Sequence, residues 1–293
     1  MKKRILSACL LVLIVMLAPA LCAAESDDTL GPGLRIMSFN IMHPDWSRVP
    51  VKGRDEIVSE ILRSYHPDVA ALQEAGAKWH KALKPLLVDT GLYAQACRQC
   101  NAEGFIYCCT TFLYDPASLR LVEETVLDLD PGDAARVLSA AEFERISDGV
   151  RFVVANTHPA PREQPEDHRR NMAGLMALVS DLRERWPGLP LIMAGDFNTP
   201  EQDGYYPELM EKAGVRDAKY EAETLVRGCS TFFGWGAAPD PGSADLCVDH
   251  IFVSPGVGVS RFEAVLGRDI ERASDHIPII ADIYFIPDQP DGR

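Results

Sequence analysis

The sequence has little positive charge and, beyond its first 24 residues, no long hydrophobic run. Lysine and arginine number 29 against 43 aspartates and glutamates, which gives a formal net charge of −14. An acidic protein gains no long-range attraction to nucleic acids or anionic membranes. The charge therefore argues against tight, non-specific DNA binding, although a local basic patch beside a metal ion can still bind a phosphate. Without a second hydrophobic segment, we expect no stable membrane insertion of the mature chain.

The first 24 residues have the three parts of a secretory signal peptide. A basic head over residues 2–4 precedes an apolar run over 5–21, and small residues follow around Cys22. This order is typical of a cleaved signal. A short membrane anchor and a lipid anchor on Cys22 are the weaker alternatives. We predict a signal peptide over 1–24, a short leader over 25–33, and a protein that is secreted or periplasmic.

Six of the eight cysteines lie outside the predicted signal peptide. Four of them are clustered and two flank a segment rich in glycine and proline: Cys97, Cys100, Cys108, Cys109, Cys229 and Cys247. An even number in an exported protein favours disulfides. The alternative for the cluster is a zinc half-site, since Cys97 and Cys100 have the Cys-x-x-Cys spacing. The sequence does not choose among the possible pairings.

Short apolar runs alternate with helical patterns along the mature chain. The predicted strands are Leu34–Phe39, Val69–Leu72, Phe152–Ala155, Leu189–Ala194, Ile251–Val253 and Ile277–Phe285. Between them, apolar residues recur at helical spacing near Ile57–Leu62 and over Met172–Leu182. This alternation indicates an α/β protein. Because we find neither a repeat nor a linker, we predict one domain over 34–286 and a tail over 287–293.

Polar residues follow four of these predicted strands directly. Asn40 follows the first strand, Glu74 the second, His158 the third, and Asp196 with Asn198 the fourth. Each of them alone is typical of a turn, a helix cap or a loop histidine. Active sites of α/β folds gather at strand ends, because the loops there converge on one face. The repeated placement therefore predicts one site.

Two later segments place ionisable residues beside apolar strands. Asp249 begins an apolar run, where a carboxylate needs a partner. Ser274-Asp275-His276 precedes the last predicted strand and by itself is typical of a hydrogen-bonded corner.

Together, six motifs resemble the endonuclease/exonuclease/phosphatase superfamily. They are Ser38-Phe39-Asn40-Ile41, Pro67-Asp68-Val69 through Gln73-Glu74, Asn156-Thr157-His158, Gly195-Asp196-Phe197-Asn198, Val248-Asp249-His250-Ile251-Phe252 and Ser274-Asp275-His276-Ile277-Pro278. The resemblance runs over about residues 34–285. It implies a four-layer sandwich of the α/β (α+β) class, with two packed β-sheets flanked by helices, and metal-assisted attack of water on phosphorus. Members include deoxyribonucleases, abasic-site endonucleases, sphingomyelinases and inositol-phosphate phosphatases.

The resemblance also implies a metal site. Glu74 would be the principal ligand, with Asn40 and Asp275 assisting. These oxygen donors suit a hard cation such as Mg²⁺ or Mn²⁺ better than zinc.

The same resemblance assigns the catalytic residues. Asp249 would pair with His276 and fix its tautomer. His276 is then either the general base or a cationic clamp on the phosphate, and Asp196 is the competing candidate for the base. His158 and Asn198 would hydrogen-bond the phosphoryl oxygens.

Three features depart from the family pattern or stay open. Some members orient the first histidine with a glutamate near the equivalent of Cys108–Thr111, where this chain has none and Glu103 lies only nearby. The segment Thr231–Gly236 is either an aromatic finger or packed loop, and we favour packing. Four arginines either neutralise a substrate phosphate or are solvated on the surface: Arg98, Arg162, Arg169 and Arg170.

We predict a secreted, divalent-metal-dependent hydrolase of phosphoester bonds, first of all a phosphodiesterase, acting as a monomer. The phosphoester substrate is a small molecule, lipid-linked or a nucleic acid, and the acidic charge favours the first two. The enzyme alternatives are a secreted nuclease and a phosphomonoesterase. A non-catalytic binding module on the same scaffold is the alternative from another class. Against the last stands the complete set of Glu74, His158, Asp196, Asn198, Asp249 and His276.

Overall fold

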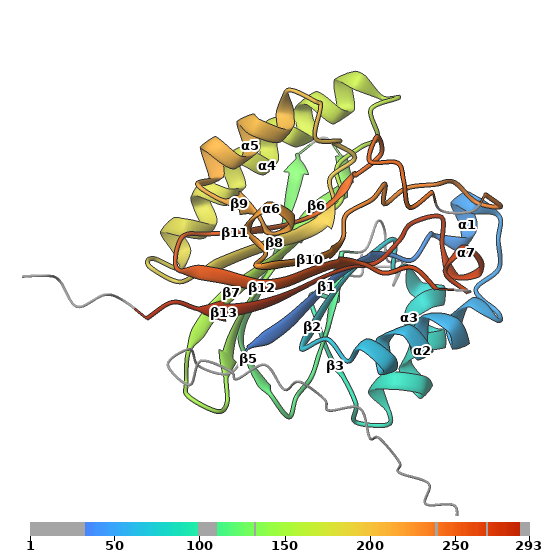
Figure 1. Ribbon diagram of the computed structural model, residues 1–293, viewed down its shortest axis with the longest axis horizontal. Coiled ribbons are helices and arrows are strands. Elements are labelled where there is room, and N and C mark those ends of the chain that lie inside the picture. The colour runs from blue at the N-terminus through green and yellow to red at the C-terminus, as the bar shows by residue number, and fades with distance from the viewer. Residues whose placement is uncertain (1–32, 99–109, 132, 238–239, 268, 288–293) are drawn as a thin grey trace, which may run out of the picture.

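Two β-sheets lie face to face at the centre of the molecule, and helices cover their outer sides (Figure 1). The computed structural model describes residues 33–98, 110–131, 133–237, 240–267 and 269–287. The sheets and helices form four layers, which confirms the predicted sandwich and the mixed α/β class. The predicted signal peptide, nearly all of the leader and most of the tail lie outside the described residues.

The first sheet has seven strands: β1 (Leu34–Asn40), β2 (Val69–Gln73), β3 (Ala94–Ala96), β4 (Thr111–Tyr114), β10 (Thr224–Arg227), β12 (Val257–Ala264) and β13 (Ile279–Phe285). Their order is β10-β12-β13-β1-β2-β4-β3. The central strand β1 runs parallel to β2 and antiparallel to β13. The first and last strands of the fold are therefore neighbours.

The second sheet has six strands: β5 (Leu119–Asp130), β6 (Asp133–Arg145), β7 (Arg151–Thr157), β8 (Leu191–Asp196), β9 (Arg216–Asp217) and β11 (Asp249–Val253). Their order is β5-β6-β7-β8-β11-β9. Strands β7 and β8 are parallel, and β11 is antiparallel to β8.

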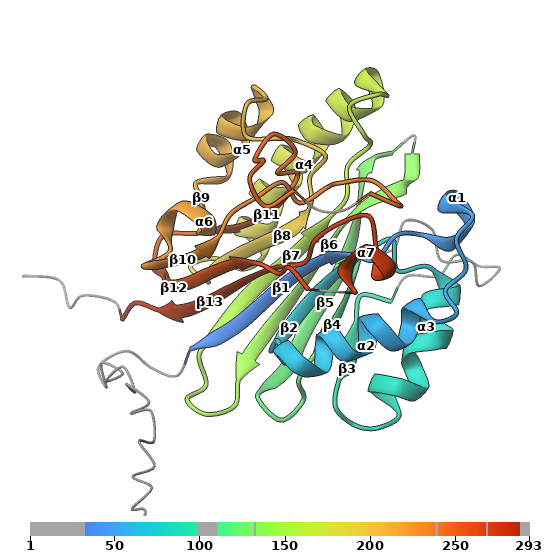
Figure 2. The ribbon, with the colours of Figure 1, turned by 45° about the vertical axis from the view of Figure 1, so that its right-hand side comes forward.

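The helices are α1 (Pro44–Ser47), α2 (Arg54–Tyr65), α3 (Ala77–Leu83) with the π-helical turn Lys84–Val88, α4 (Pro165–Arg185), α5 (Tyr205–Ala213), α6 (Ala218–Glu221) and α7 (Ile270–Ala273). Helices α2 and α3 cover the first sheet, and α4 and α5 cover the second, as Figure 2 shows. Among the described residues, no helix is long and apolar enough to cross a membrane.

The pleat of β7 explains why its sequence reads as one apolar run. Phe152 and Val154 belong to the core between the two sheets, whereas Val153 and Ala155 belong to the core under α4. Successive side chains of a strand point to opposite faces, and here both faces are buried. All six apolar runs predicted as strands are strands, namely β1, β2, β7, β8, β11 and β13, and both helical patterns are helices, α2 and α4.

Candidate active site

The eight residues predicted for the site converge at one edge of the two sheets. A cleft of about 350 Å³ opens there, and six of the eight line it: Glu74, His158, Asp196, Asn198, Asp275 and His276. Asn40 and Asp249 lie directly behind it, hydrogen-bonded to Asp196 and His276 respectively.

The strand register produces this convergence. In the first sheet Asn40 ends β1 opposite Gln73, so Glu74 follows at the same level. In the second sheet Thr157 lies opposite Gly195, so His158 and Asp196 leave their strands together. The loops after four strands therefore meet above both sheets, as active-site loops of α/β folds do.

One oxygen of Asp196 is the centre of the site. Asp196 Oδ2 accepts a hydrogen bond from Asn40 Nδ2 at 3.0 Å and lies 3.3 Å from His158 Nε2 and 3.6 Å from His276 Nε2. Its second oxygen accepts from the backbone N–H of Asn198 at 2.9 Å. Burial raises the pKa of Asp196, against the opposing effect of the charge on His276.

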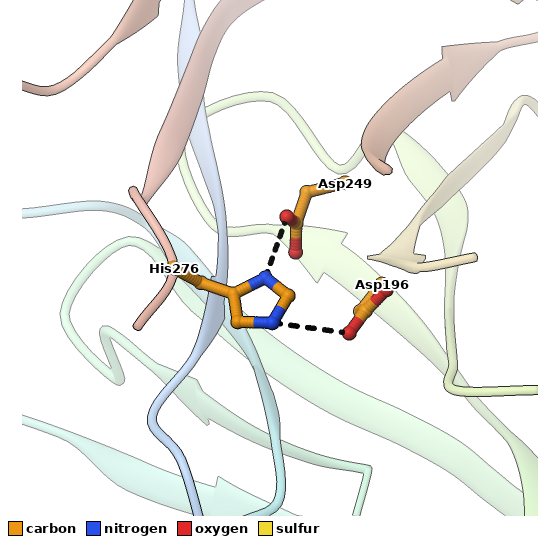
Figure 3. Close-up of side chains that lie close together, drawn as sticks. All are labelled: Asp196, Asp249 and His276. Atoms are coloured by element: carbon orange, nitrogen blue, oxygen red, sulfur yellow. Dashed lines mark hydrogen bonds and ion pairs between the residues drawn. The ribbon is translucent and has the colours of Figure 1, made fainter. Parts of the chain in front are cut away.

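His276 lies between two carboxylates (Figure 3). Its Nδ1 is 2.9 Å from Asp249 Oδ2, which confirms the predicted pairing. Burial alone would lower the pKa of His276, but Asp249 and Asp196 outweigh burial and raise it. Thr231 holds the carboxylate in place, because its hydroxyl oxygen accepts from the backbone N–H of Asp249 at 3.0 Å.

His158 reaches the site with only one ring nitrogen engaged. Within the described part of the chain, its buried Nδ1 has no hydrogen-bond partner. Burial, together with the charges of Arg136 and His276, holds its pKa well below the usual range. The backbone here is anchored by Arg136, which donates to the carbonyl of His158 at 3.1 Å. Some family members carry an orienting glutamate in a segment where this chain has none. The residues in and near that segment here, Glu103, Cys108 and Cys109, lie outside the described residues.

Asn198 joins two loops of the site. Its Nδ2 donates to the carbonyl of Pro159 at 2.9 Å, and its backbone has a φ of +50°. A non-glycine residue with positive φ is uncommon and is retained where the surroundings require it. Its contact with a phosphoryl oxygen stays a prediction.

Glu74 also has a positive φ, of +59°. One carboxylate oxygen accepts from Asn40 Nδ2 at 3.2 Å, and the other accepts from the backbone N–H of His43. Asn40 Oδ1 accepts from the backbone N–H of Met42 at 2.9 Å. The amide nitrogen of Asn40 therefore faces the carboxylates, and its ligation of a cation by oxygen stays a prediction.

The donors at this edge fit a divalent cation. Asp196, Asp249 and His276 offer three ligand atoms within 4.8 Å of one another. This trio differs from the predicted one, although Glu74 and Asp275 add two carboxylates to the lining of the same cleft. In the described chain, Asp249 Oδ1 is buried without a hydrogen-bond partner. A set dominated by carboxylate oxygens is the chemistry of a hard cation.

An amide pair below the cleft ties the sheets together. Gln73 Nε2 donates to Asn156 Oδ1 at 2.8 Å, and Asn156 Nδ2 donates to the carbonyls of Leu72 and Thr111 at 2.9 and 3.0 Å. Both side chains are fully buried. Both lie inside the sequence motifs, which predict no role for them. The signal available in the sequence was a polar residue near the end of an apolar strand.

Arg54 is a second support that we missed. Its buried guanidinium donates to the carbonyls of Met42 at 3.0 Å and Ala273 at 2.8 Å, and it lies 4.9 Å from the centre of the Trp79 ring. It thus fixes the loop after Asn40 to the turn before Asp275. No local sequence pattern marks this arginine.

The structure also shows where the segment Thr231–Gly236 and the four arginines lie. The ring of Phe232 lies 5.0 Å from the His276 ring, and the N–H of Phe233 donates to the carbonyl of Asp275 at 3.1 Å. The segment Thr231–Gly236 therefore packs against the site at these positions, as we favoured. Of the four arginines, Arg162 lines the cleft. Arg169 and Arg170 form ion pairs with acidic residues, and Arg98 is exposed near His80.

The predicted disulfide is not found among the cysteines that the structure describes. Cys97, Cys229 and Cys247 are buried free thiols. Cys247 Sγ donates to the carbonyl of Cys229 at 2.9 Å, and Cys97 Sγ donates to backbone carbonyls. The remaining predicted partners, Cys100, Cys108 and Cys109, lie outside the described residues, and Cys100 is also the second cysteine of the predicted zinc half-site.

The fold matches solved structures over nearly their whole length. A mannosyl-6-phosphatase from Bacteroides thetaiotaomicron shares 19% identity at a TM-score of 0.71, covering 86% of this chain and 100% of that one. The human Nocturnin catalytic domain with a bound sulfate anion shares 19% at 0.68, covering 87% and 94%. D. rerio TDP2 complexed with single-strand DNA product shares 19% at 0.67, covering 86% and 98%.

Sequence comparisons give the family. None of the curated protein sequences compared with the chain matches it. The model of the Endonuclease/Exonuclease/phosphatase family matches residues 37–276, which include all eight residues of the candidate site. The chain belongs to the endonuclease/exonuclease/phosphatase family, whose members hydrolyse phosphoester bonds.

Proposed function

We propose that this chain is a divalent-metal-dependent phosphodiesterase that hydrolyses small-molecule phosphodiesters with water as the nucleophile. The main support is the position of Asp196 Oδ2, which lies within 3.6 Å of His158 Nε2 and His276 Nε2 at the wall of the cleft. A carboxylate and two imidazoles around one point can accept a proton and bind phosphoryl oxygens in the same step.

In the proposed mechanism Asp196 takes the proton of the attacking water. The water oxygen forms a bond to phosphorus while the bond from phosphorus to the leaving oxygen breaks on the opposite side. The leaving oxygen keeps the electron pair of that bond and takes up a proton from solvent. His276, held between two carboxylates, acts as a cation that donates to a phosphoryl oxygen, and Asp249 fixes its orientation. His158 and Asn198 bind the remaining phosphoryl oxygens as their charge grows. In the alternative with His276 as the base, a neutral imidazole would have to lie beside both carboxylates.

The cation would be Mg²⁺ or Mn²⁺. We assign it to Glu74 and Asp275, because both offer carboxylate oxygens at the cleft, with Asn40 as the assisting ligand that the family resemblance implies. When bound, such an ion supplies Lewis acidity at the phosphoryl and leaving oxygens.

The cleft supports a small substrate. Its volume of about 350 Å³ lies near the lower end of the range for small-molecule sites. Among the described residues, its lining includes two arginines, Arg136 and Arg162, besides the two histidines. With a net charge of −14, the whole protein does not attract a polyanion. A phosphomonoester is the second candidate, supported by the similarity to the structure named mannosyl-6-phosphatase.

We also propose export, supported by the pattern of residues 1–24. Protein recovered from the periplasm or medium should begin close to Glu25, as N-terminal sequencing would show. An intact Met1 in that material would contradict cleavage.

A substrate panel tests the activity. The substrates are bis-p-nitrophenyl phosphate, p-nitrophenyl phosphate, supercoiled DNA, sphingomyelin and inositol phosphates, each with Mg²⁺, Mn²⁺ or EDTA. We expect metal-dependent hydrolysis of the small diester, with loss of at least about 100-fold in Asp196→Asn. Faster turnover of the monoester would establish the second candidate, and turnover of DNA alone would identify a nuclease. Absence of turnover on every substrate would favour the binding module.

A further inference from the structure

Trp46 stands at the cleft with about half of its side chain open to solvent. It is 51% exposed and lines the cleft together with Arg136 and His158. A large aromatic side chain at the wall of a catalytic cleft offers apolar surface that no part of the described chain covers. A ligand bound there would bury it.

Helix α1, which carries Trp46, is anchored to the candidate metal site through its N-cap residue His43. The backbone N–H of His43 donates to the Glu74 carboxylate, and the His43 ring lies 4.6 Å from the Trp46 ring. Gly76 makes room for this arrangement, because a Cβ there would overlap the His43 ring. Trp46 is therefore held in place before any ligand arrives, which lowers the entropy cost of binding.

Arg136 approaches Trp46 from the other sheet. Its guanidinium carbon lies 5.8 Å from the centre of the Trp46 ring, and its Nη1 donates to the carbonyl oxygen of His158. Trp46 and Arg136 thus join helix α1, which follows β1 of the first sheet, to β6 of the second sheet beside His158. Because Trp46 and His158 line one cleft, a single ligand can place its phosphate at His158 and an attached organic group against Trp46.

The Trp46 ring favours an uncharged group at this position. The carboxylates of the cleft, Glu74, Glu163, Asp196 and Asp275, are accompanied by Arg136, Arg162 and His276, so the lining charges alone do not select the group. A second anionic group packed on the ring would lose its hydration and meet the negative face of the π system. A neutral ring gains contact with the tryptophan without this cost.

We propose that Trp46 and Arg136 form a subsite for an uncharged, ring-bearing organic group of the substrate, with the Trp46 ring packing against the flat face of that group. The inference rests on the proposed function, because the phosphate anchors the ligand. Either an aromatic ring, such as a nucleobase, or the apolar face of a sugar would supply the flat surface that packs against Trp46.

Phosphonates test the subsite without hydrolysis, because their carbon–phosphorus bond is not cleaved by phosphoesterases. Calorimetric titration with Mg²⁺ present would compare methylphosphonate, phenylphosphonate and a hexose 6-phosphonate. The parent should bind a ring-bearing compound about three- to tenfold more tightly than methylphosphonate. Trp46→Ala should lose this preference and keep the affinity for methylphosphonate, while Trp46→Phe keeps part of the preference. Tyr220→Ala removes a 63% exposed aromatic outside the cleft lining and should change nothing.

The outcomes separate this inference from the function on which it rests. A preference for phenylphosphonate alone identifies an aromatic group, and a preference for the hexose phosphonate alone identifies a sugar. If Trp46→Ala keeps the parent's preference, or if the parent has none, the subsite is overturned while the phosphate site stands. If the parent binds no phosphonate at all, the subsite is overturned, and the substrate panel decides the proposed function separately.

Discussion

Asp196 and Asp249 lie directly opposite each other on the antiparallel strands β8 and β11. Like charges in this position destabilise a sheet, and both side chains are buried. His276 lies between them, 2.9 Å from one and 3.6 Å from the other. The imidazolium therefore compensates two carboxylates that the fold forces together.

The first prediction follows from this compensation. His276→Asn should lower the free energy of unfolding of the metal-free protein at neutral pH by about 3 kcal/mol, because it leaves buried carboxylates without their cation. Urea unfolding with EDTA present measures this. Asp249→Asn/His276→Asn should recover part of the loss, since only one of the two carboxylates then remains. Equal stability of the single variant and the parent would show that His276 does not compensate the two carboxylates in the fold.

The second prediction concerns His80, which lies on α3 away from the cleft. Burial, with a smaller effect of the Arg98 charge, lowers its pKa from 6.5 to about 4, and Gln95 hydrogen-bonds its Nδ1. Between these values the unfolded chain binds a proton that the folded chain does not. Stability should therefore fall as the pH drops from 6.5 to 4, by about 3 kcal/mol from this group.

Urea unfolding across that pH range measures the slope. His80→Gln should make it shallower, because the titrating group is gone. His66→Asn removes a histidine whose side chain is 49% exposed and should leave the slope nearly as it is. An unchanged slope in His80→Gln would show that burial of His80 does not contribute to acid sensitivity.

The third prediction concerns Cys229 and Cys247. Their segments are paired, because the N–H of Thr231 donates to the carbonyl of Leu246 at 2.9 Å, and Cys247 Sγ contacts the carbonyl of Cys229. Burial raises the pKa of both thiols, to about 11 for Cys247. Because the thiolate is the reactive form, folded thiols should react slowly, and oxidation should occur during folding.

Protein from an oxidising compartment should therefore contain at least one oxidised pair among the six mature cysteines, with Cys229–Cys247 the pair that this arrangement favours. Alkylation of denatured protein with and without reduction, followed by peptide mass spectrometry, measures the pairing. Cys229→Ser/Cys247→Ser is the control that removes the pair. Six free thiols in such material would contradict the prediction, and stoichiometric zinc would favour the metal alternative.

The part of the fold predicted from sequence is the part buried on both sides. Strands such as β2 and β8 are apolar up to their ends because both of their faces are buried. The β5–β6 hairpin was missed, since many positions of β5 are exposed and even Val122 is 42% open to solvent. The sequence of β5 therefore carries no continuous apolar run, and the pairing of β5 with β6 is visible only in the folded sheet.

The candidate site also has residues that the sequence predicts and residues that it does not. Residues at strand ends, such as Glu74 and Asp196, were predictable because strand position and motif indicated them together. Arg54 was not, because it contacts Ala273 across 219 positions through a backbone carbonyl, which leaves no pattern in the partner's side chain. Trp46 was missed for a similar reason, since its place beside Arg136 depends on the packing of two sheets.

The last prediction separates the role of Asp249 from that of Glu74. Asp249 contacts His276 and lies behind the cleft, whereas Glu74 lines it. Asp249→Asn should lower kcat, by as much as about 10⁴-fold if the loss resembles that of an orienting triad carboxylate, and should change metal affinity little. Glu74→Gln removes a negative oxygen ligand, so its activity should fall and recover partly as Mg²⁺ or Mn²⁺ is raised. The measurement is kcat/KM against metal concentration for both variants and the parent, with metal affinity determined by calorimetry. Rescue of Asp249→Asn by metal, together with indifference of Glu74→Gln, would mean that the cation binds at Asp196, Asp249 and His276 instead, the trio whose ligand atoms already lie within 4.8 Å of one another.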